Sequence, residues 1–386
     1  MNLHRLARPQ KGVQKGWRRR DRPIAGRPLD RNYRPSMATN LTLDMMASPL
    51  PLRQVGDLAR RAESAGFGAM WFTEGARTAS LSCAASALAT ERLGLGTAIA
   101  VAFPRSPMVT AQMAWELAEA TGGRYVVGLG TQVKAHVERR YSSPYAPPGP
   151  RLREYVRAVK AIFRAFRGEE KLTFEGEHYS FNLLPRMWSP GPIDVADPPV
   201  YISAVLPWMS RMAGAECDGI HIHPMHSPGW LANVQLPEVA TGAASAGRSM
   251  KDVTVVCPVI IAVGDTDEEI AAARDANRAT IAFYGSTPNY APVLEHHGFD
   301  GLQGELNACQ RSGDMATMIS LVDDDVLDHY TVSATWSDLG GVLADRYRGM
   351  APHTRVMTYT ALDHWRSDPD LLDRWSDVAR HLADAG

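Results

Sequence analysis

Short apolar runs that alternate with longer segments of helical spacing constrain the fold of this chain most. The run at 69–72 (AMWF) is apolar on both faces, and the segment before it places Val55, Leu58 and Ala62 on one helical stripe. Strands that are apolar on both faces are typical of a parallel sheet covered by helices. The predicted strands are residues 41–46, 69–72, 93–100, 124–130, 199–204, 218–223, 253–263 and 355–362. Eight strand–helix units predict an α/β fold, a closed (β/α)8 TIM barrel.

Capping residues mark several of the intervening helices. Ser106 and Pro107 provide an N-cap and a first-turn proline, and Gly122 with Gly123 ends that helix. Thr266 followed by Glu269 has the spacing of a capping box. A last amphipathic helix is expected over 371–382.

Three segments exceed the minimal repeat and predict insertions at the carboxyl-terminal mouth or rim of the barrel. They are the Pro- and Tyr-rich 141–150, a hairpin over 171–181, and 285–325. Long insertions in compact domains are usually functional lids. Of these three insertions, the segments 141–150 and 285–325 are predicted to decide which substrate binds.

The first 36 residues differ in charge from the rest of the chain. They hold eleven Lys or Arg against two Asp, a net charge of +9, whereas residues 37–386 carry −10. The arm has no apolar core of a secretory signal, so we predict a basic, disordered extension (1–36) before one barrel domain that includes the C-terminal helix (37–386). The acidic remainder argues against nucleic acid as a partner, and no apolar run is long enough to cross a bilayer.

The cysteines carry no paired spacing. Cys83, Cys217, Cys257 and Cys309 are scattered along the chain. Scattered thiols are typical of small buried hydrophobic side chains in a reducing compartment. The sequence therefore predicts a cytoplasmic protein.

The stretch GLGTQVKAHVERRY, which begins within the end of the fourth predicted strand, is the first candidate site. Gly128 and Gly130 let the backbone turn, and Thr131, Gln132 and His136 present polar groups where a helix should start. In a parallel barrel this position lies at the mouth, where active sites occur. Taken alone, the segment fits an ordinary glycine turn before a solvated helix equally well.

The other strand ends add small and apolar residues to the same rim. Such walls suit a planar, uncharged ring. Pro207 at a helix start leaves backbone amides for a phosphate, although a plain proline-started helix explains it equally well. The further candidates at this rim are Asp44, Glu74, Thr97, Ala98, Ile99, Ser203 and Ala204.

The segment HIHPMH supports an alternative from another class. His221 and His223 alternate onto one strand face and His226 follows, which approaches metal-ligand geometry. A metal hydrolase on a TIM barrel would also need ligands at later strand ends, and the last predicted strand offers only Thr and Tyr there. We therefore predict no metal and expect the strand histidines to line the pocket. A second pair, His296 and His297, is interpreted as part of a solvated loop.

Four segments together resemble the bacterial luciferase-like monooxygenase superfamily, and in particular its actinobacterial branch of oxidoreductases that use the deazaflavin coenzyme F420. The similar region spans about residues 37 to 361. The segments are GFGAMWFTEG, LGLGTAIAVAFPRSP, the stretch from RYVVGLG to VKAIF, and YISAVLPWMSRMAGAECDGIHIHP.

The resemblance implies a flavin-type ring at the barrel mouth, with roles for individual residues. Ala98-Ile99 matches a position where the family often has a non-prolyl cis peptide behind the ring. A departure is Val133, which stands where several relatives have a glutamate. The implied cofactor contacts are Thr97, Ala98, Ile99, Gly130, Thr131, Gln132 and His136 at the ring, Ser203, Ala204 and Pro207 at the phosphate, with Asp44 and Glu74 toward the substrate.

The sequence and the resemblance together predict an F420-dependent oxidoreductase that transfers a hydride between the deazaflavin and a small organic substrate. His136 is the predicted proton-handling group and Glu74 the next candidate, because histidine is the usual acid or base near neutral pH. The alternatives are an FMN-dependent monooxygenase of the same fold, the metal hydrolase, and a non-catalytic binding barrel. Relatives commonly pair, so we expect a homodimer with a small-molecule substrate and neither a nucleic-acid nor a membrane partner.

Overall fold

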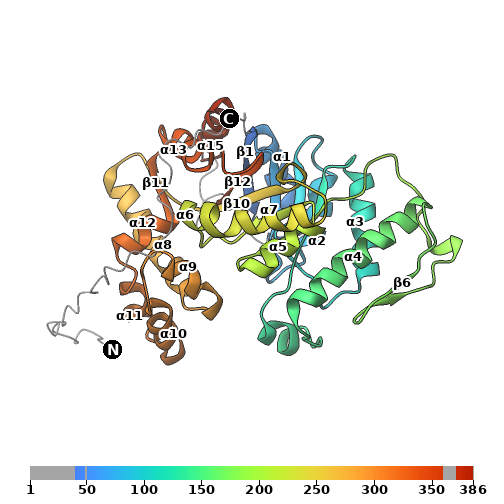
Figure 1. The fold of residues 1–386 in the computed structure, drawn as a ribbon. Coiled ribbons are helices and arrows are strands. Elements are labelled where there is room, and N and C mark those ends of the chain that lie inside the picture. The colour runs from blue at the N-terminus through green and yellow to red at the C-terminus, as the bar shows by residue number, and fades with distance from the viewer. Residues whose placement is uncertain (1–39, 48–49, 360–370, 386) are drawn as a thin grey trace, which may run out of the picture.

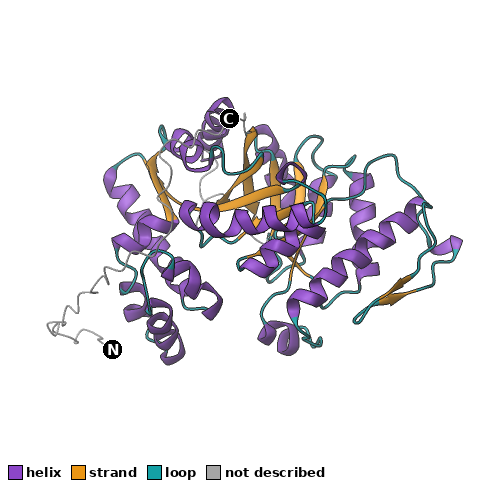
Figure 2. Ribbon diagram, viewed as in Figure 1, coloured by secondary structure: helices purple, strands orange, loops and turns teal. Residues whose placement is uncertain are grey.

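A closed parallel barrel forms the centre of the molecule (Figures 1 and 2). The computed structural model describes residues 40–47, 50–359 and 371–385. Each strand pairs with the next around the ring, and the last strand pairs with the first, which confirms the predicted (β/α)8 barrel. In order around the barrel, the strands are β1 (Asn40–Ala47), β2 (Ala69–Phe72), β3 (Gly94–Thr97), β5 (Tyr125–Gly130), β8 (Val200–Ala204), β9 (Gly219–Ile222), β10 (Thr254–Gly264) and β12 (His353–Tyr359).

The barrel helices begin and end where the caps predict. Ser106 Oγ accepts the amide of Met108 at 3.2 Å, and Thr266 Oγ1 accepts that of Glu269 at 3.3 Å. The Glu269 carboxylate bonds to the Asp265 amide, so the expected reciprocal half of the capping box is displaced by one residue. The main helices are α1 (Leu52–Ser64), α2 (Ala79–Ala87), α3 (Pro107–Ala120), α4 (Pro148–Arg167), α5 (Pro207–Glu216), α7 (Leu236–Ser245), α8 (Asp267–Gly285), α13 (Leu339–Tyr347) and α15 (Leu371–Ala385).

Two strands differ from the prediction. The expected third strand, 93–100, is interrupted and continues as β4 (Ala100–Val101). A strand absent from the prediction, β11 (Thr331–Thr335), pairs with the end of β10, while the earlier part of β10 pairs with β12. The predicted last strand begins at 353 and is described as far as 359, and its residues 360–362 lie outside the described part of the chain.

The insertions take three different forms. The expected hairpin is present as β6 (Phe174–Glu175) and β7 (Ser180–Phe181), and Glu154 holds its turn by accepting three backbone amides. Segment 141–150 is irregular until α4 begins. The third insertion is helical and has its own apolar core, and it gathers on the side of the barrel opposite β6 (Figure 1). Its helices are α9 (Ala291–Glu295), α10 (Leu302–Ser312), α11 (Met315–Ser320) and α12 (Asp324–Tyr330).

The basic arm, the absence of a membrane span and the burial of the cysteines were expected from the composition. The basic arm, 1–36, lies outside the described residues. In the described ranges, no helix is both long and apolar enough to cross a membrane. Cys83, Cys217 and Cys257 are buried as expected, whereas Cys309 is half-buried, and all four are free thiols.

Candidate active site

The third barrel strand bulges at the mouth. Between two paired stretches, the three residues 97–99 face only 127 and 128 of β5, so one residue is extra. Thr97 Oγ1 replaces the interrupted ladder: it donates to the Gly128 carbonyl at 2.7 Å and accepts the Gly128 amide at 2.9 Å. The peptide bond between Ala98 and Ile99 is cis, which confirms that expectation. Thr97 is fully buried, and its hydrogen bonds to Gly128 join the two strands where the bulge begins.

Three strand ends meet next to this bulge. A Cβ atom at Gly130 would lie 2.6 Å from Ile99 Cδ1 and 2.9 Å from Ser203 Oγ. A side chain at position 130 would therefore require Ile99 or Ser203 to move. The structure thus brings together Ile99, Gly130 and Ser203 from three separate candidate segments.

The loop after β5 carries the polar candidates. Thr131 and Gln132 are half-buried, and Gln132 has a left-handed backbone (φ 55°) while its Oε1 accepts the Val133 amide at 2.9 Å. His136 begins a single π-helical turn, η1 (His136–Arg140). Its imidazole is exposed and has no hydrogen-bond partner among the described residues.

The end of β8 leads into α5. Ser203 is half-buried, and the carbonyl of Ala204 accepts Gln235 Nε2 at 2.8 Å. Helix α5 begins at Pro207 after Leu206, which has no polar side chain to cap it. The amides of the first turn are therefore left for solvent or a ligand.

Asp44 does not face the mouth. Its carboxylate is fully buried in the barrel, where it accepts Trp71 Nε1 at 2.7 Å and forms a two-point ion pair with Arg355 at 2.6 and 2.7 Å. Arg355 Nη2 lies near Gly68, at the amino end of β2. The resemblance implied that Asp44 faces the substrate. Its two carboxylate oxygens are instead bonded to Arg355 and Trp71 inside the barrel.

Glu74 is also engaged. Its Oε2 accepts the Val101 amide and Arg105 Nη1, both at 2.7 Å, and the side chain is 5% exposed. The carboxylate thus links the loop after β2 to β4 on the far side of the bulge. The sequence analysis missed both arginine partners, Arg105 and Arg355, because neither lies in a recognisable motif.

The three histidines of HIHPMH lie in different surroundings. His221 is buried in the barrel with its ring 4.7 Å edge-on from Trp71, and neither of its ring nitrogens has a partner among the described residues. His226 Nε2 bonds to the Tyr347 hydroxyl at 2.8 Å, and His223 packs against tyrosines. In the part of the chain that the structure describes, no three His, Cys, Asp or Glu side chains are arranged to hold a metal. The feature that suggested a metal hydrolase therefore has a different explanation.

The prediction of a solvated loop at His296 and His297 is wrong. His297 Nε2 bonds to Ser227 Oγ at 2.6 Å, and its ring stacks on that of His329 at 3.9 Å. Both histidines are half-buried. The sequence did not reveal this because the contacts join α9 to segments far away in the chain.

Buried histidines should make the protein sensitive to acid. Burial lowers the pKa of His221, His223, His226 and His297 from 6.5 to about 3 in each case. Between these values the unfolded chain binds more protons, so the free energy of unfolding should fall as the pH drops below 6.5, by at most about 1.4 kcal/mol per pH unit for each histidine. Urea unfolding at pH 7.5, 6 and 5 measures this, and a constant midpoint would contradict it.

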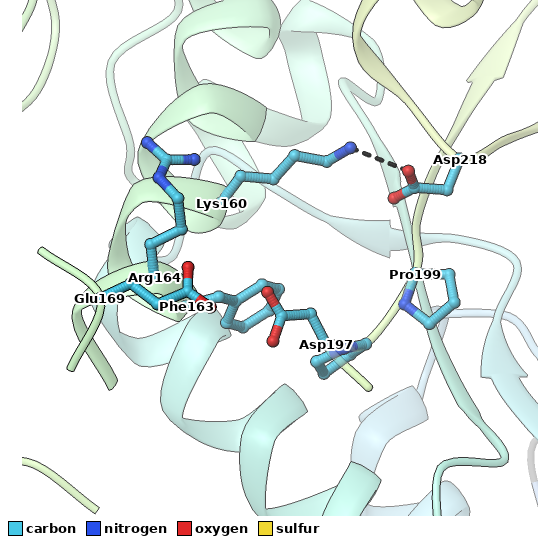
Figure 3. Close-up of a pocket in the computed structure, with 8 residues that line it drawn as sticks. Lys160, Phe163, Arg164, Glu169, Asp197, Pro199 and Asp218 are labelled. Atoms are coloured by element: carbon cyan, nitrogen blue, oxygen red, sulfur yellow. Dashed lines mark hydrogen bonds and ion pairs between the residues drawn. The ribbon is translucent and has the colours of Figure 1, made fainter. Parts of the chain in front are cut away.

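One surface pocket lies at the other end of the barrel (Figure 3). It has a volume of about 550 Å³ and is lined by residues before β8 and β9, among them Pro199 and Asp218. Lys160 Nζ pairs with Asp218 at 2.9 Å there. Because parallel barrels place their chemistry at the carboxyl ends of the strands, this pocket is not the candidate active site.

A family comparison decides the affiliation of this barrel. The model described as luciferase-like monooxygenase matches residues 36–353. The chain belongs to the luciferase-like monooxygenase family. This luciferase-like chain is 40% identical over 302 residues to an uncharacterised protein of Mycobacterium tuberculosis, covering 78% of the chain and 89% of the relative. It is 28% identical over 293 residues to 5,10-methylenetetrahydromethanopterin reductase of Methanolobus tindarius, covering 75% and 85%.

Solved structures share the luciferase-like fold. The coenzyme F420 dependent tetrahydromethanopterin reductase of Methanopyrus kandleri superposes with a TM-score of 0.68 at 20% identity, covering 90% of this chain and 99% of the other. The oxygenating constituent of 3,6-diketocamphane monooxygenase from Pseudomonas putida, in complex with FMN, gives 0.62 at 14% identity, covering 90% and 99%. These neighbours show a shared fold, and they include both an F420-dependent and an FMN-bound protein.

Proposed function

We propose that this luciferase-like protein is an F420-dependent oxidoreductase that transfers a hydride between the deazaflavin and a small organic substrate. The observation that carries the proposal is the close convergence at the mouth, where Ile99 and Ser203 pack tightly beside Gly130, which has no side chain of its own. A flat ring can approach the backbone closely there. The similarity to the 5,10-methylenetetrahydromethanopterin reductase of Methanolobus tindarius, and to the F420-dependent reductase structure from Methanopyrus kandleri, adds support.

The chain's residues would bind and orient the cofactor. The Ile99 side chain backs the ring, the half-buried Thr131 and Gln132 offer polar groups along its edge, and the uncapped start of α5 after Ser203 and Ala204 accepts the phosphate. When bound, the deazaflavin supplies the hydride from its carbon-5. The residues of the mouth then need only hold the substrate above the deazaflavin ring and exclude water.

His136 is the proposed proton-handling group. Its ring is exposed and without a partner among the described residues, so it is free to exchange a proton with substrate or solvent. Glu74 would have to leave Arg105 and the Val101 amide to do the same. We therefore assign Glu74 the task of holding β4 and the bulge in place.

FMN remains the alternative cofactor, and it would support oxygen activation in place of hydride transfer. The FMN complex among the structural neighbours favours this alternative. Absorbance and fluorescence titration of the purified protein with F420 and with FMN separates the two. Saturable binding of F420 but not of FMN is expected, and the reverse preference would overturn the proposal.

Gly130→Ala tests this convergence directly. The new Cβ would crowd Ile99 and Ser203, so we expect F420 affinity to fall at least about tenfold, which is about 1.4 kcal/mol. Fluorescence titration measures the affinity. Gly304→Ala is the matched control, because a Cβ at Gly304 meets no atom within 4 Å. Equal affinity in the two variants would argue against a ring at this position.

We also propose a cytoplasmic homodimer, as the family pattern and the scattered free thiols suggest. Leu81 on α2, Leu88 directly after α2 and Val109 on α3 are exposed apolar side chains. Such residues are typical of a surface covered by a second subunit. Light scattering after size-exclusion chromatography tests the mass, and a monomer at micromolar concentration would oppose this assignment.

A further inference from the structure

His223 lies at the carboxyl end of β9, two strands along the barrel from β5, which pairs with the bulged strand. It directly follows β9, and His221, two residues earlier, lies inside the barrel against Trp71. Residues two apart on a strand face the same way, so His223 is placed above His221 at the carboxyl end of the barrel. No motif in the sequence assigned it a role of its own.

One hydrogen bond to the His223 ring indicates which nitrogen carries the proton. The Met225 amide donates to His223 Nδ1 at 3.1 Å, so Nδ1 is the acceptor nitrogen. The proton of a neutral imidazole is then on Nε2. The ring is half-buried, and Nε2 has no hydrogen-bond partner among the described residues. His223 therefore presents a free N–H donor.

Two tyrosine rings pack against the imidazole of His223. The ring of Tyr284 lies edge-on at 4.6 Å and that of Tyr290 at 4.5 Å from the imidazole. Tyr359 is the last described residue of β12, and its hydroxyl bonds to that of Tyr284. Among the described residues, the His223 ring contacts the two tyrosine rings and the Met225 amide, so a substrate that meets His223 here should be uncharged at that point.

We propose that His223 donates a hydrogen bond from Nε2 to an uncharged carbonyl oxygen of the substrate, or to the hydroxyl formed from it. Tyr284, Tyr290 and Tyr359 would hold a planar or apolar portion of the same molecule. The proposal rests on the proposed function and narrows its substrate to small neutral ketones and aldehydes, or the corresponding alcohols.

Reduction of the carbonyl compound requires no proton from His223. A hydride joins the carbonyl carbon, the electron pair of the C–O π bond moves onto oxygen, and that oxygen takes a proton from His136 or water. The substrate gains two electrons that the reduced deazaflavin loses. Losing the Nε2 proton would leave an anionic ring among the tyrosines, which is unfavourable. His223 therefore stabilises charge that develops on the oxygen and keeps its own proton.

The tautomer is measurable before any substrate is known. Long-range proton–nitrogen correlation spectra of the ¹⁵N-histidine-labelled protein, with His223→Gln used to assign its signals, should show His223 neutral with its proton on Nε2 near pH 7. The Nδ1-protonated tautomer would overturn the proposal, because the donor would then point at the Met225 amide.

Activity tests the substrate contact. Two measurements compare wild type with His223→Phe, His223→Gln and the control His353→Gln. The first is the rate of reduction of acetone, cyclohexanone or benzaldehyde by reduced F420. The second is the binding of each carbonyl compound to the protein–F420 complex. We expect kcat/KM to fall about 10- to 100-fold in the Phe variant. The fall should be smaller in the Gln variant, because glutamine retains an amide donor. The control should keep the wild-type value, because His353 is exposed at the amino end of β12. The pH profile should keep its shape, because no proton leaves His223.

The outcomes separate this inference from the proposed function. If wild type fails to bind F420, the proposed function is wrong. If it binds F420 but neither reduces nor binds any of the three carbonyl compounds, or if the Phe variant matches wild type, the role of His223 is wrong. Unchanged F420 affinity in all variants, with the loss confined to the carbonyl compound, supports it.

Discussion

Asp44→Ala is expected to lower the free energy of unfolding by about 3–5 kcal/mol. The change leaves the Arg355 guanidinium buried without its carboxylate and removes the acceptor of the Trp71 indole N–H. Burial acts against the charge on Arg355, and the Asp44 carboxylate counters it by raising the arginine pKa. Urea unfolding followed by circular dichroism measures the loss.

A surface pair provides the control for this variant. Asp57 pairs with Arg60 on α1, with side chains 71% and 57% exposed. Asp57→Ala should change stability by less than about 0.5 kcal/mol, because solvent screens such a pair. Similar losses in the two variants would mean that the pair inside the barrel contributes no more than an exposed one.

Gly128→Ala should be the second most damaging change and should affect both stability and the site. Its Cβ would lie 1.9 Å from the carbonyl oxygen of Thr97 and 2.8 Å from His221 Nε2. The first obstacle is backbone, so β3 and β5 must separate where the bulge begins. We expect a loss of about 3 kcal/mol or more, at the upper end for overpacking, together with loss of F420 binding.

Gly304→Ala is again the matched control. Gly304 lies in α10, where a Cβ meets open space, so alanine should raise stability by about 0.5–1 kcal/mol through its better helix propensity. Thermal unfolding and F420 titration of both variants provide the comparison. A Gly128→Ala protein with wild-type stability would show that β3 and β5 yield easily at the bulge.

These two positions show how the barrel interior supports the mouth. Asp44 and Arg355 connect β1 to β12 inside the barrel, while Thr97 and Gly128 connect β3 to β5 just below the bulge. Neither pair needs to touch a ligand to influence binding. Both position the strand ends from which Ile99, Gly130 and Ser203 converge.

Much of the candidate site could be anticipated from individual segments. The glycines at the end of the fourth predicted strand and the position of the Ala98-Ile99 cis peptide were identified from sequence and resemblance. The tyrosines beside His223 could not be anticipated, because Tyr284 at the end of α8 and Tyr290 just after it lie more than 60 positions further along the chain. The alternation of His221 and His223 was the one available signal for this part of the site, and it suggested a metal.

The sequence by itself determined the order of strands and helices, and hence the barrel and the end that carries its site. Periodicity and caps act within a few residues of each other, so they can be recognised in a single segment. Only the tertiary structure decided which polar groups are free. Asp44 meets Arg355 across 311 positions of the chain and Glu74 meets Arg105 across 31, whereas His136 and His223 keep a nitrogen without a partner in the described residues. Pairing at such separations depends on how the closed barrel brings distant segments together, and no local pattern encodes it.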